Sequence, residues 1–213
     1  MINKILLRIK EKYPLTELDV GDMTSLKARG MKFTISAYRA EGLGHVSVMS
    51  AVGFFGLMRM DTVIINPTEL DMPLYSYDRI YAAGNDVLIT ELYDTTSSEW
   101  QGDGLDAVKA KYADITERDP GEHWYDAIKL PSSISKKGKK KGSAKMDALA
   151  LEHLAAYLET GTSVSNYQLK CDKTAAYVNG LLEKGGPSTD VFKKALGVEK
   201  TTELFHKVLF GTK

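Results

Sequence analysis

Hydrophobic and polar residues alternate along much of the first half of the chain, and this period of two predicts β-strands. An amphipathic helix precedes them and ends near Pro14, with its apolar residues at helical spacing. The strand-like runs are separated by short breaks, which favours an antiparallel meander. The predicted strands span residues 31–40, 44–51 and 57–66, with two more inside the segment 70–94.

The segment 70–94 is typical of a β-hairpin that turns at Ala83-Gly84-Asn85. Because strand side chains alternate between faces, Asp78 shares its face with mostly apolar residues. These neighbours are Leu74, Ser76, Ile80 and Ala82. A carboxyl group in such a row must be paired, be kept protonated by desolvation, or line a cavity. The pattern alone also fits an Asp78 that merely pairs with an arginine, a lysine or a backbone amide.

The last third of the chain is predicted to be helical. Two apolar stripes run through it, and the second stops at Gly185-Gly186-Pro187, as helix C-termini commonly do. The expected helices lie over residues 105–112, 146–158 and 167–182, with two more that begin near 188–190 and 201–202. Residues 123–128 lead into a further short strand. The chain therefore predicts one α+β domain over residues 1–213, with an antiparallel sheet of about six strands sandwiched between α-helices.

The segment Ser132–Ser143 is dominated by lysine, glycine and serine, so it has no apolar periodicity to bury. This composition predicts a mobile, solvated linker. The alternative is a docking patch for an acidic protein. Nucleic acid fits less well, because no aromatic residues lie between the lysines.

Charge and composition narrow the classes of partner. Lysine plus arginine equals aspartate plus glutamate at 28 each, so no overall field attracts nucleic acid or a membrane, although local patches remain open. The N-terminal helix is too short and too charged for a signal peptide or a membrane span. The single cysteine, Cys171, excludes an internal disulfide. We therefore expect a cytoplasmic protein without nucleic-acid or membrane partners.

Common catalytic motifs are absent from the sequence. There is no phosphate-binding loop, no glycine-rich dinucleotide turn and no paired spacing of metal ligands, so no metal is expected. Asp61 and His45 are two further polar residues on the predicted strands. Asp61 shares a face with Arg59 and has a simple interpretation as an ion pair, whereas His45 fits a half-buried, hydrogen-bonded histidine.

Two distant groups of residues resemble the ferredoxin-dependent bilin reductases. The first is Met72-Pro73-Leu74-Tyr75-Ser76-Tyr77-Asp78, preceded by Ile64-Ile65-Asn66-Pro67, which resembles the proline, aromatic and aspartate of that family's central strand. The second is Cys171-Asp172-Lys173-Thr174, followed by Leu182-Glu183-Lys184 and closed by Val208-Leu209-Phe210. It is similar to the family's aspartate-bearing C-terminal helix and its ending. The family's antiparallel sheet between helical layers agrees with the predicted pattern.

The resemblance implies reduction of a linear tetrapyrrole, such as biliverdin, by single electrons from ferredoxin or flavodoxin. No metal or flavin would be bound tightly. Each electron makes the bilin more basic, so an acid must deliver a proton. On this interpretation Asp78 is the first proton donor and Asp172 the second, unless Asp172 is a solvated aspartate on a helix surface. Lys173 would pair with a substrate propionate, and Arg59 is a second candidate for substrate binding.

The chain departs from the family's pattern at several positions. Asp61 stands where relatives carry a histidine, if the strands align without gaps, and Ala175 stands where an arginine often follows the threonine. His45 resembles the family's other strand histidine if the alignment shifts by a residue pair, and Ser47 then replaces a glutamate. Asp61 and His45 are therefore further catalytic candidates. The bond that is reduced stays open.

Two other functions fit the same residues. One is a non-catalytic tetrapyrrole-binding or carrier protein on the same fold. The other is an interaction module that docks through the lysine-rich segment. On the reductase hypothesis, the run Lys136–Lys141 would receive an acidic ferredoxin.

Overall fold

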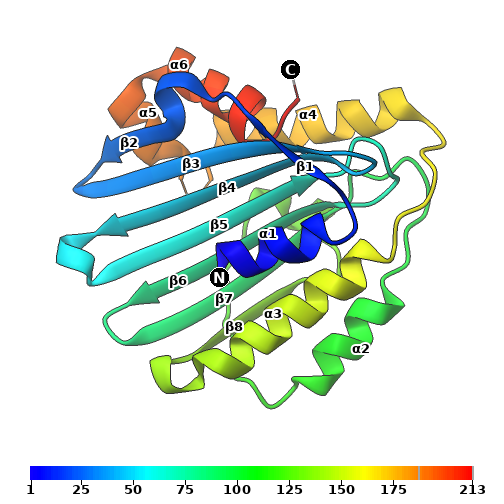
Figure 1. Ribbon diagram of the computed structural model, residues 1–213, viewed down its shortest axis with the longest axis horizontal. Coiled ribbons are helices and arrows are strands. Elements are labelled where there is room, and N and C mark those ends of the chain that lie inside the picture. Colours follow the sequence, from blue (N-terminus) through cyan, green and yellow to red (C-terminus); the bar gives the residue numbers. More distant parts are fainter. Residues whose placement is uncertain (187, 213) are drawn as a thin grey trace.

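The computed structural model describes residues 1–186 and 188–212, and over these residues the chain forms one antiparallel sheet of eight strands with helices on both faces (Figure 1). The strand order is β1-β3-β4-β5-β6-β7-β8, and β2 pairs with β3 beside β1. The strands are β1 (Leu15–Leu18), β2 (Ser25–Ala28), β3 (Met31–Ala40), β4 (Gly44–Gly53), β5 (Met58–Asn66), β6 (Leu74–Ala82), β7 (Asn85–Tyr93) and β8 (Ile134–Lys139). The helices are α1 (Ile2–Lys10), α2 (Asp103–Lys111), α3 (Ser143–Leu158), α4 (Tyr167–Lys184), α5 (Thr189–Leu196) and α6 (Val198–Glu203), and a π-helical segment, Leu204–Leu209, continues α6.

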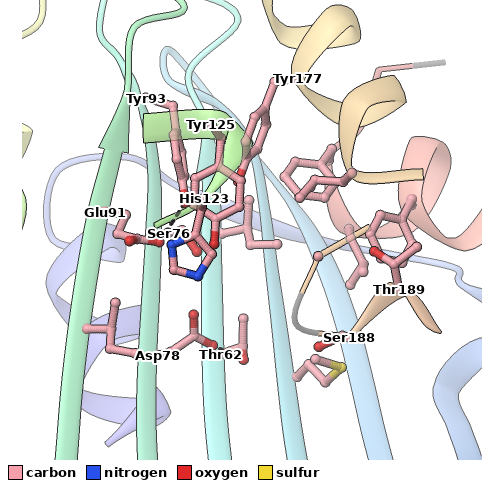
Figure 2. A pocket seen from close by; sticks show the side chains of 18 of the residues that line it. Thr62, Ser76, Asp78, Glu91, Tyr93, His123, Tyr125, Tyr177, Ser188 and Thr189 are labelled. Atoms are coloured by element: carbon pink, nitrogen blue, oxygen red, sulfur yellow. Dashed lines mark hydrogen bonds between the residues drawn. The ribbon is translucent and has the colours of Figure 1, made fainter. Parts of the chain in front are cut away.

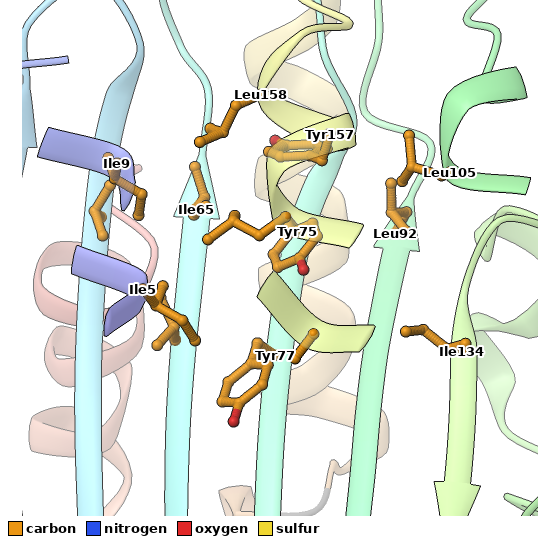
Figure 3. Packing of buried hydrophobic residues seen from close by; sticks show 14 of the residues in the cluster. Ile5, Ile9, Ile65, Tyr75, Tyr77, Leu92, Leu105, Ile134, Tyr157 and Leu158 are labelled. Atoms are coloured by element: carbon orange, nitrogen blue, oxygen red, sulfur yellow. The ribbon is translucent and has the colours of Figure 1, made fainter. Parts of the chain in front are cut away.

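Helices α1 and α3 pack on one face of the sheet (Figure 3). Ile5 and Ile9 of α1 are buried in the same apolar cluster as Tyr75 and Tyr77 of β6. Tyr157 of α3 joins them, with its ring centroid 4.6 Å from that of Tyr75. Because each large apolar side chain contributes on the order of 1.5–3 kcal/mol when fully buried, this cluster supplies much of the stability of the fold.

Helices α4 and α5 and the π-helical segment cover the opposite face (Figure 1). Phe192 of α5 packs on Phe33 of β3, with ring centroids 5.0 Å apart. Leu74 of β6 belongs to this second cluster. Ser76 and Asp78 lie two and four residues further along β6, so they point toward the same helices.

The alternating pattern identifies β3 to β7 correctly, including the hairpin between β6 and β7. Its turn uses positive φ at Ala83 (49°) and Gly84 (78°), as a tight hairpin turn requires. The predicted helices are also present, although the first turn of the last one begins earlier, at Val198. Pro187, part of the predicted helix stop, lies outside the described residues.

The strand count differs from the prediction of about six. Two added strands, β1 and β2, have four residues each, too few to show a period of two. Residues Trp124–Ile128 form a 3₁₀ turn instead of leading into a strand. The prediction that Ser132–Ser143 is a mobile linker is wrong, because it contains β8 and the start of α3.

Strand β8 lies at the edge of the sheet, where lysines are common because they discourage pairing with other chains. Lys136 is nevertheless buried, and it forms an ion pair with Glu117. Lys137, Lys139 and the lysines that follow them are exposed. Along the described part of the chain, every helix is too short or too polar to cross a membrane.

Candidate active site

A cavity of about 220 Å³ lies between the sheet and the helices of the α4 face (Figure 2). Its floor is formed by side chains of β4 to β7, and its walls come from α4, the C-terminal segment and the irregular chain before Tyr125. Ionisable side chains gather here within an otherwise largely apolar lining. They are Asp78, Glu91, Tyr93, Arg118, His123, Tyr125 and Tyr177.

Asp78 lies on the cavity floor, and its carboxyl accepts a hydrogen bond of 2.5 Å from Thr62 Oγ1. Thr62 is its direct partner in the β5–β6 register. Burial, supported by the nearby charge of Glu91 and opposed by the Thr62 hydrogen bond, raises the pKa of Asp78 to about 6. At neutral pH this carboxyl can therefore hold or release a proton within the cavity.

Glu91 is the second carboxyl group of the floor. It lies on β7 opposite Ser76, one step along the same face from Asp78. Glu91 accepts a hydrogen bond of 2.6 Å from Tyr93 Oη, and Lys129 Nζ lies 3.8 Å from its other oxygen. The charge of Glu91 favours the protonated form of Asp78.

Aromatic rings form one wall of the cavity (Figure 2). The ring centroids of Tyr93 and Tyr177 are 4.3 Å apart, and Tyr125 meets Tyr93 edge-on at 5.6 Å. The imidazole of His123 stacks on Tyr125 at 4.8 Å, with an interplanar angle of 9°. Such a wall presents π-surfaces to a flat, conjugated ligand.

Asp61 and Arg59 lie on the other face of β5, away from this cavity. Asp61 is buried, with Arg59 Nη2 3.1 Å from one of its oxygens and Ser50 Oγ donating to the other at 2.8 Å. Thr62, and not Asp61, is the cross-strand neighbour of Asp78, so Asp61 lies one residue away from the position on β5 that faces the cavity. A shift of one residue moves a side chain to the opposite face of a sheet.

His45 and Ser47 hold the C-terminal segment against β4. His45 Nε2 is 2.8 Å from the carbonyl oxygen of Val208, and Ser47 Oγ donates to that of Leu209 at 2.7 Å. Burial lowers the pKa of His45. Neither residue lines the cavity that contains Asp78.

Asp172 and Lys173 of α4 do not line the cavity. Asp172 is exposed and accepts a hydrogen bond of 2.8 Å from Gln168 Nε2. Lys173 Nζ donates to the carbonyl oxygen of Thr96 at 2.8 Å and lies 3.2 Å from Asp94. Of the six residues singled out in the sequence, only Asp78 lies among the described residues of the cavity wall.

Several residues that line the cavity were not predicted from the sequence. Glu91 could have been found by extending the hairpin register from its turn at Ala83-Gly84, since it falls on the face of Asp78. Thr62 lies on the same face in the β5–β6 pair, whose longer connection does not fix the register in the same way. Arg118 and His123 belong to an irregular segment that has no periodicity to read. Within residues 1–186 and 188–212, no group of three or more His, Cys, Asp or Glu side chains is arranged for a metal ion.

No protein-family description matches this sequence, and no curated protein matches it significantly. Among solved structures, the fold matches the crystal structure of phytochromobilin synthase from tomato in complex with biliverdin, with a TM-score of 0.77. The match covers 99% of this chain and 82% of the tomato protein, at 14% sequence identity. The chain therefore has the fold of phytochromobilin synthase, which confirms the antiparallel sheet between helical layers implied by the two sequence segments.

Proposed function

We propose that this protein is a bilin reductase, which reduces a linear tetrapyrrole of the biliverdin type with single electrons from ferredoxin or flavodoxin. One observation carries the proposal: Asp78, with its pKa raised to about 6, lies in an aromatic-walled cavity of the fold of phytochromobilin synthase. The match to a protein crystallised with biliverdin supports the substrate class.

The chemistry fits the floor of the cavity. An electron added to a conjugated bilin raises the basicity of the pigment, and a nearby carboxylic acid then transfers its proton to it. A general acid works best when its pKa lies close to the working pH, and about a tenth of a carboxyl with a pKa of 6 is protonated at pH 7. Asp78 is therefore the proton donor of this proposal. Burial, with a smaller contribution from the charge of Glu91, raises the protonated fraction of Asp78 at this pH.

The electrons come from an external donor, since the proposal needs no tightly bound metal or flavin. Ferredoxins and flavodoxins that act as such donors are acidic, and a basic surface would steer them. Exposed lysines at the end of β8 and in the turn before α3 offer such a surface, namely Lys137, Lys139, Lys140 and Lys141. Lys136 takes no part, because it is buried and forms an ion pair with Glu117.

The cavity must widen to admit four pyrrole rings. Its 220 Å³ is below the range of about 300–1,000 Å³ that encloses ligands of this class. The irregular chain between Arg118 and His123 is the wall with the least regular structure. Its ends are tied down: the Arg118 N–H donates to Ser135 O at 2.9 Å and the His123 N–H to Asp126 at 2.7 Å. We expect residues 119–122 to move outward when pigment binds.

A spectroscopic titration tests the proposal. Purified protein is mixed with biliverdin, the absorption spectrum is recorded, and reduced ferredoxin is then added. A spectral shift on mixing, followed by bleaching or displacement of the bilin bands on reduction, is the expected result. No change on mixing would overturn any pigment function.

The second candidate is a non-catalytic tetrapyrrole-binding or carrier protein. The position of Asp172 favours it, because the second acid implied by the resemblance lies outside the cavity. A bound spectrum that reduced ferredoxin leaves unaltered would select this function over the reductase.

A further inference from the structure

One end of the sheet carries an exposed apolar tip. The connection between β4 and β5 contains Phe54, Phe55 and Leu57, whose exposed fractions are 56%, 108% and 71%. Phe55 is thus as accessible as in an extended peptide. Large apolar side chains that gather at full exposure commonly mark a contact surface.

The backbone of this tip is unfavourable for its residues. Phe54 has φ 52° and Phe55 has φ 56°, both in the left-handed region that favours glycine or asparagine. If this turn served folding alone, glycine or asparagine would be expected at these two positions. Two phenylalanines with exposed rings are not explained by folding. Strained conformations of this kind cluster at functional sites.

Basic residues flank the tip. The sheet register aligns Ala28, Met31, Gly53 and Met58, so the β2–β3 turn lies beside the β4–β5 tip (Figure 1). A groove runs between the two turns, lined by Lys27, Arg29 and Lys32 together with both phenylalanines. All three cations are exposed, and the described lining of the groove contains no aspartate or glutamate. The balanced charge of the whole chain conceals this local positive patch.

We propose that this end of the sheet docks the protein on an anionic lipid surface. We call it the basic aromatic tip, defined as Lys27, Arg29, Lys32, Phe54, Phe55 and Leu57. Apolar side chains of a surface-bound protein insert about 5–10 Å into the boundary between headgroups and acyl chains. Cations placed behind them meet the lipid phosphates and the negative surface potential.

The shape of the tip favours a membrane over a protein partner. Stable protein interfaces bury roughly 800 Å² on each side, with aromatic anchors seated in pockets. Here the phenylalanines project from a narrow turn, with Lys27 and Lys32 in the adjacent strands and Arg29 in the adjacent turn. This docking needs no membrane-crossing helix, and it is independent of pigment binding.

Vesicle sedimentation tests the proposal. The full chain is mixed with phosphatidylcholine vesicles that contain or lack phosphatidylserine. We expect binding only to the anionic vesicles, weakened by added salt because screening reduces the attraction of exposed charges. Phe54→Ser/Phe55→Ser should weaken this binding by about tenfold or more, since it removes the inserted apolar surface.

Matched controls separate the tip from general effects. Val198→Ser changes another exposed apolar residue, 66% accessible on α6, and should bind as the wild type does. Lys27→Gln/Lys32→Gln should weaken binding, whereas Lys10→Gln/Lys207→Gln, with the same change in net charge, should not. Unfolding in urea shows that every variant is folded.

A fluorescence measurement locates the contact directly. Phe55→Trp should shift to the blue on anionic vesicles and be quenched by brominated acyl chains, while Val198→Trp should show neither effect. The wild-type signal of Trp100 and Trp124 is subtracted as background. Absence of wild-type binding to anionic vesicles, unquenched Phe55→Trp on bound protein, or full binding by Phe54→Ser/Phe55→Ser would each overturn the proposal. Tip-dependent binding to an acidic protein, with none to vesicles, would also overturn it.

Discussion

Thr62 donates a 2.5 Å hydrogen bond from Oγ1 to Oδ1 of Asp78, directly across the β5–β6 pair. This bond is the main interaction that opposes the effect of burial on the Asp78 carboxyl. It favours the ionised form, whereas desolvation and Glu91 favour the protonated form. The acidity of Asp78 is thus set by its neighbours on two adjacent strands.

Replacement of Thr62 by valine removes the hydrogen-bond donor and keeps the shape of the side chain. We expect Thr62→Val to raise the pKa of Asp78 by about one unit, since a hydrogen bond to a charged group contributes on the order of 1.5 kcal/mol. The protonated carbonyl band of Asp78, followed by infrared spectroscopy against pH, measures this shift. Thr90→Val is the matched control, because Thr90 is buried on the opposite face of β7. An unchanged titration in Thr62→Val would contradict the assignment.

Asp78→Asn removes the proton donor and preserves the volume of the side chain. The variant should bind biliverdin but lose turnover by at least about a hundredfold, as expected for loss of a general acid. Because electrons still arrive, we expect an organic radical to accumulate, which electron paramagnetic resonance detects.

The control for that experiment is Asp172→Asn. Asp172 is exposed on the outer side of α4, so this variant should turn over within about twofold of the wild type if the helix keeps its place. Wild-type turnover by Asp78→Asn would remove Asp78 from the mechanism. A loss in Asp172→Asn as large as in Asp78→Asn would show that α4 rearranges around bound pigment.

The raised pKa of Asp78 also predicts how stability depends on pH. The folded state holds the proton up to about pH 6, while the unfolded carboxyl releases it near its ordinary value of 3.8. As pH rises from 3.8 to about 6, the contribution of Asp78 therefore lowers the free energy of unfolding by about 3 kcal/mol. Asp78→Asn should be more stable than the wild type at pH 8 and no more stable at pH 3. Urea unfolding at both values measures this, and an equal difference at the two pH values would contradict it.

Ser47 fastens the C-terminal segment to β4 through its hydrogen bond to Leu209 O. Ser47→Ala removes the donor to Leu209 O and leaves that buried carbonyl without its partner, which should cost about 1–2 kcal/mol. Urea unfolding measures the loss. Ser36→Ala, a partly exposed position on the neighbouring strand, is the control. If both serine variants unfold alike, Ser47 does not fasten this segment.

The fold follows from the sequence wherever alternation is long enough to read. Strands β3 to β7 have nine or ten residues each, and their apolar residues recur on fixed faces. The lysine-rich β8 does not show alternating apolar residues. It pairs with β7 at the edge of the sheet, where lysines are tolerated, so it needs no apolar face to form. Burial of Lys136 depends on Glu117, a distant residue that local composition cannot reveal.

Only part of the candidate site could be predicted from the sequence, because most of its residues are brought together by strand register and tertiary contacts. Asp78 is recognisable because a carboxylate interrupts an apolar row of a strong strand. Asp61 was a candidate through the resemblance alone, and the β5–β6 register, which sequence cannot fix to a single residue, turns it to the other face of β5 and places Thr62 opposite Asp78. His123 reaches the cavity from irregular chain, where position depends on tertiary contacts such as its stacking on Tyr125.

On the proposed function, we expect Arg118 to pair with the carboxylates of the substrate. Arg118 lines the cavity, whereas Lys173, the residue implied by the resemblance, is held outside it by Thr96 and Asp94. A guanidinium can bind a propionate through two parallel hydrogen bonds. We expect Arg118→Gln to weaken biliverdin binding by about tenfold and Lys173→Gln to leave it unchanged, both measured by absorption titration. Biliverdin dimethyl ester, which lacks the charges, should bind wild type and Arg118→Gln equally, because no ion pair is left to lose. A tenfold loss of ester binding in Arg118→Gln would show that Arg118 only shapes the cavity wall, and a loss confined to Lys173→Gln would restore Lys173 as the propionate partner.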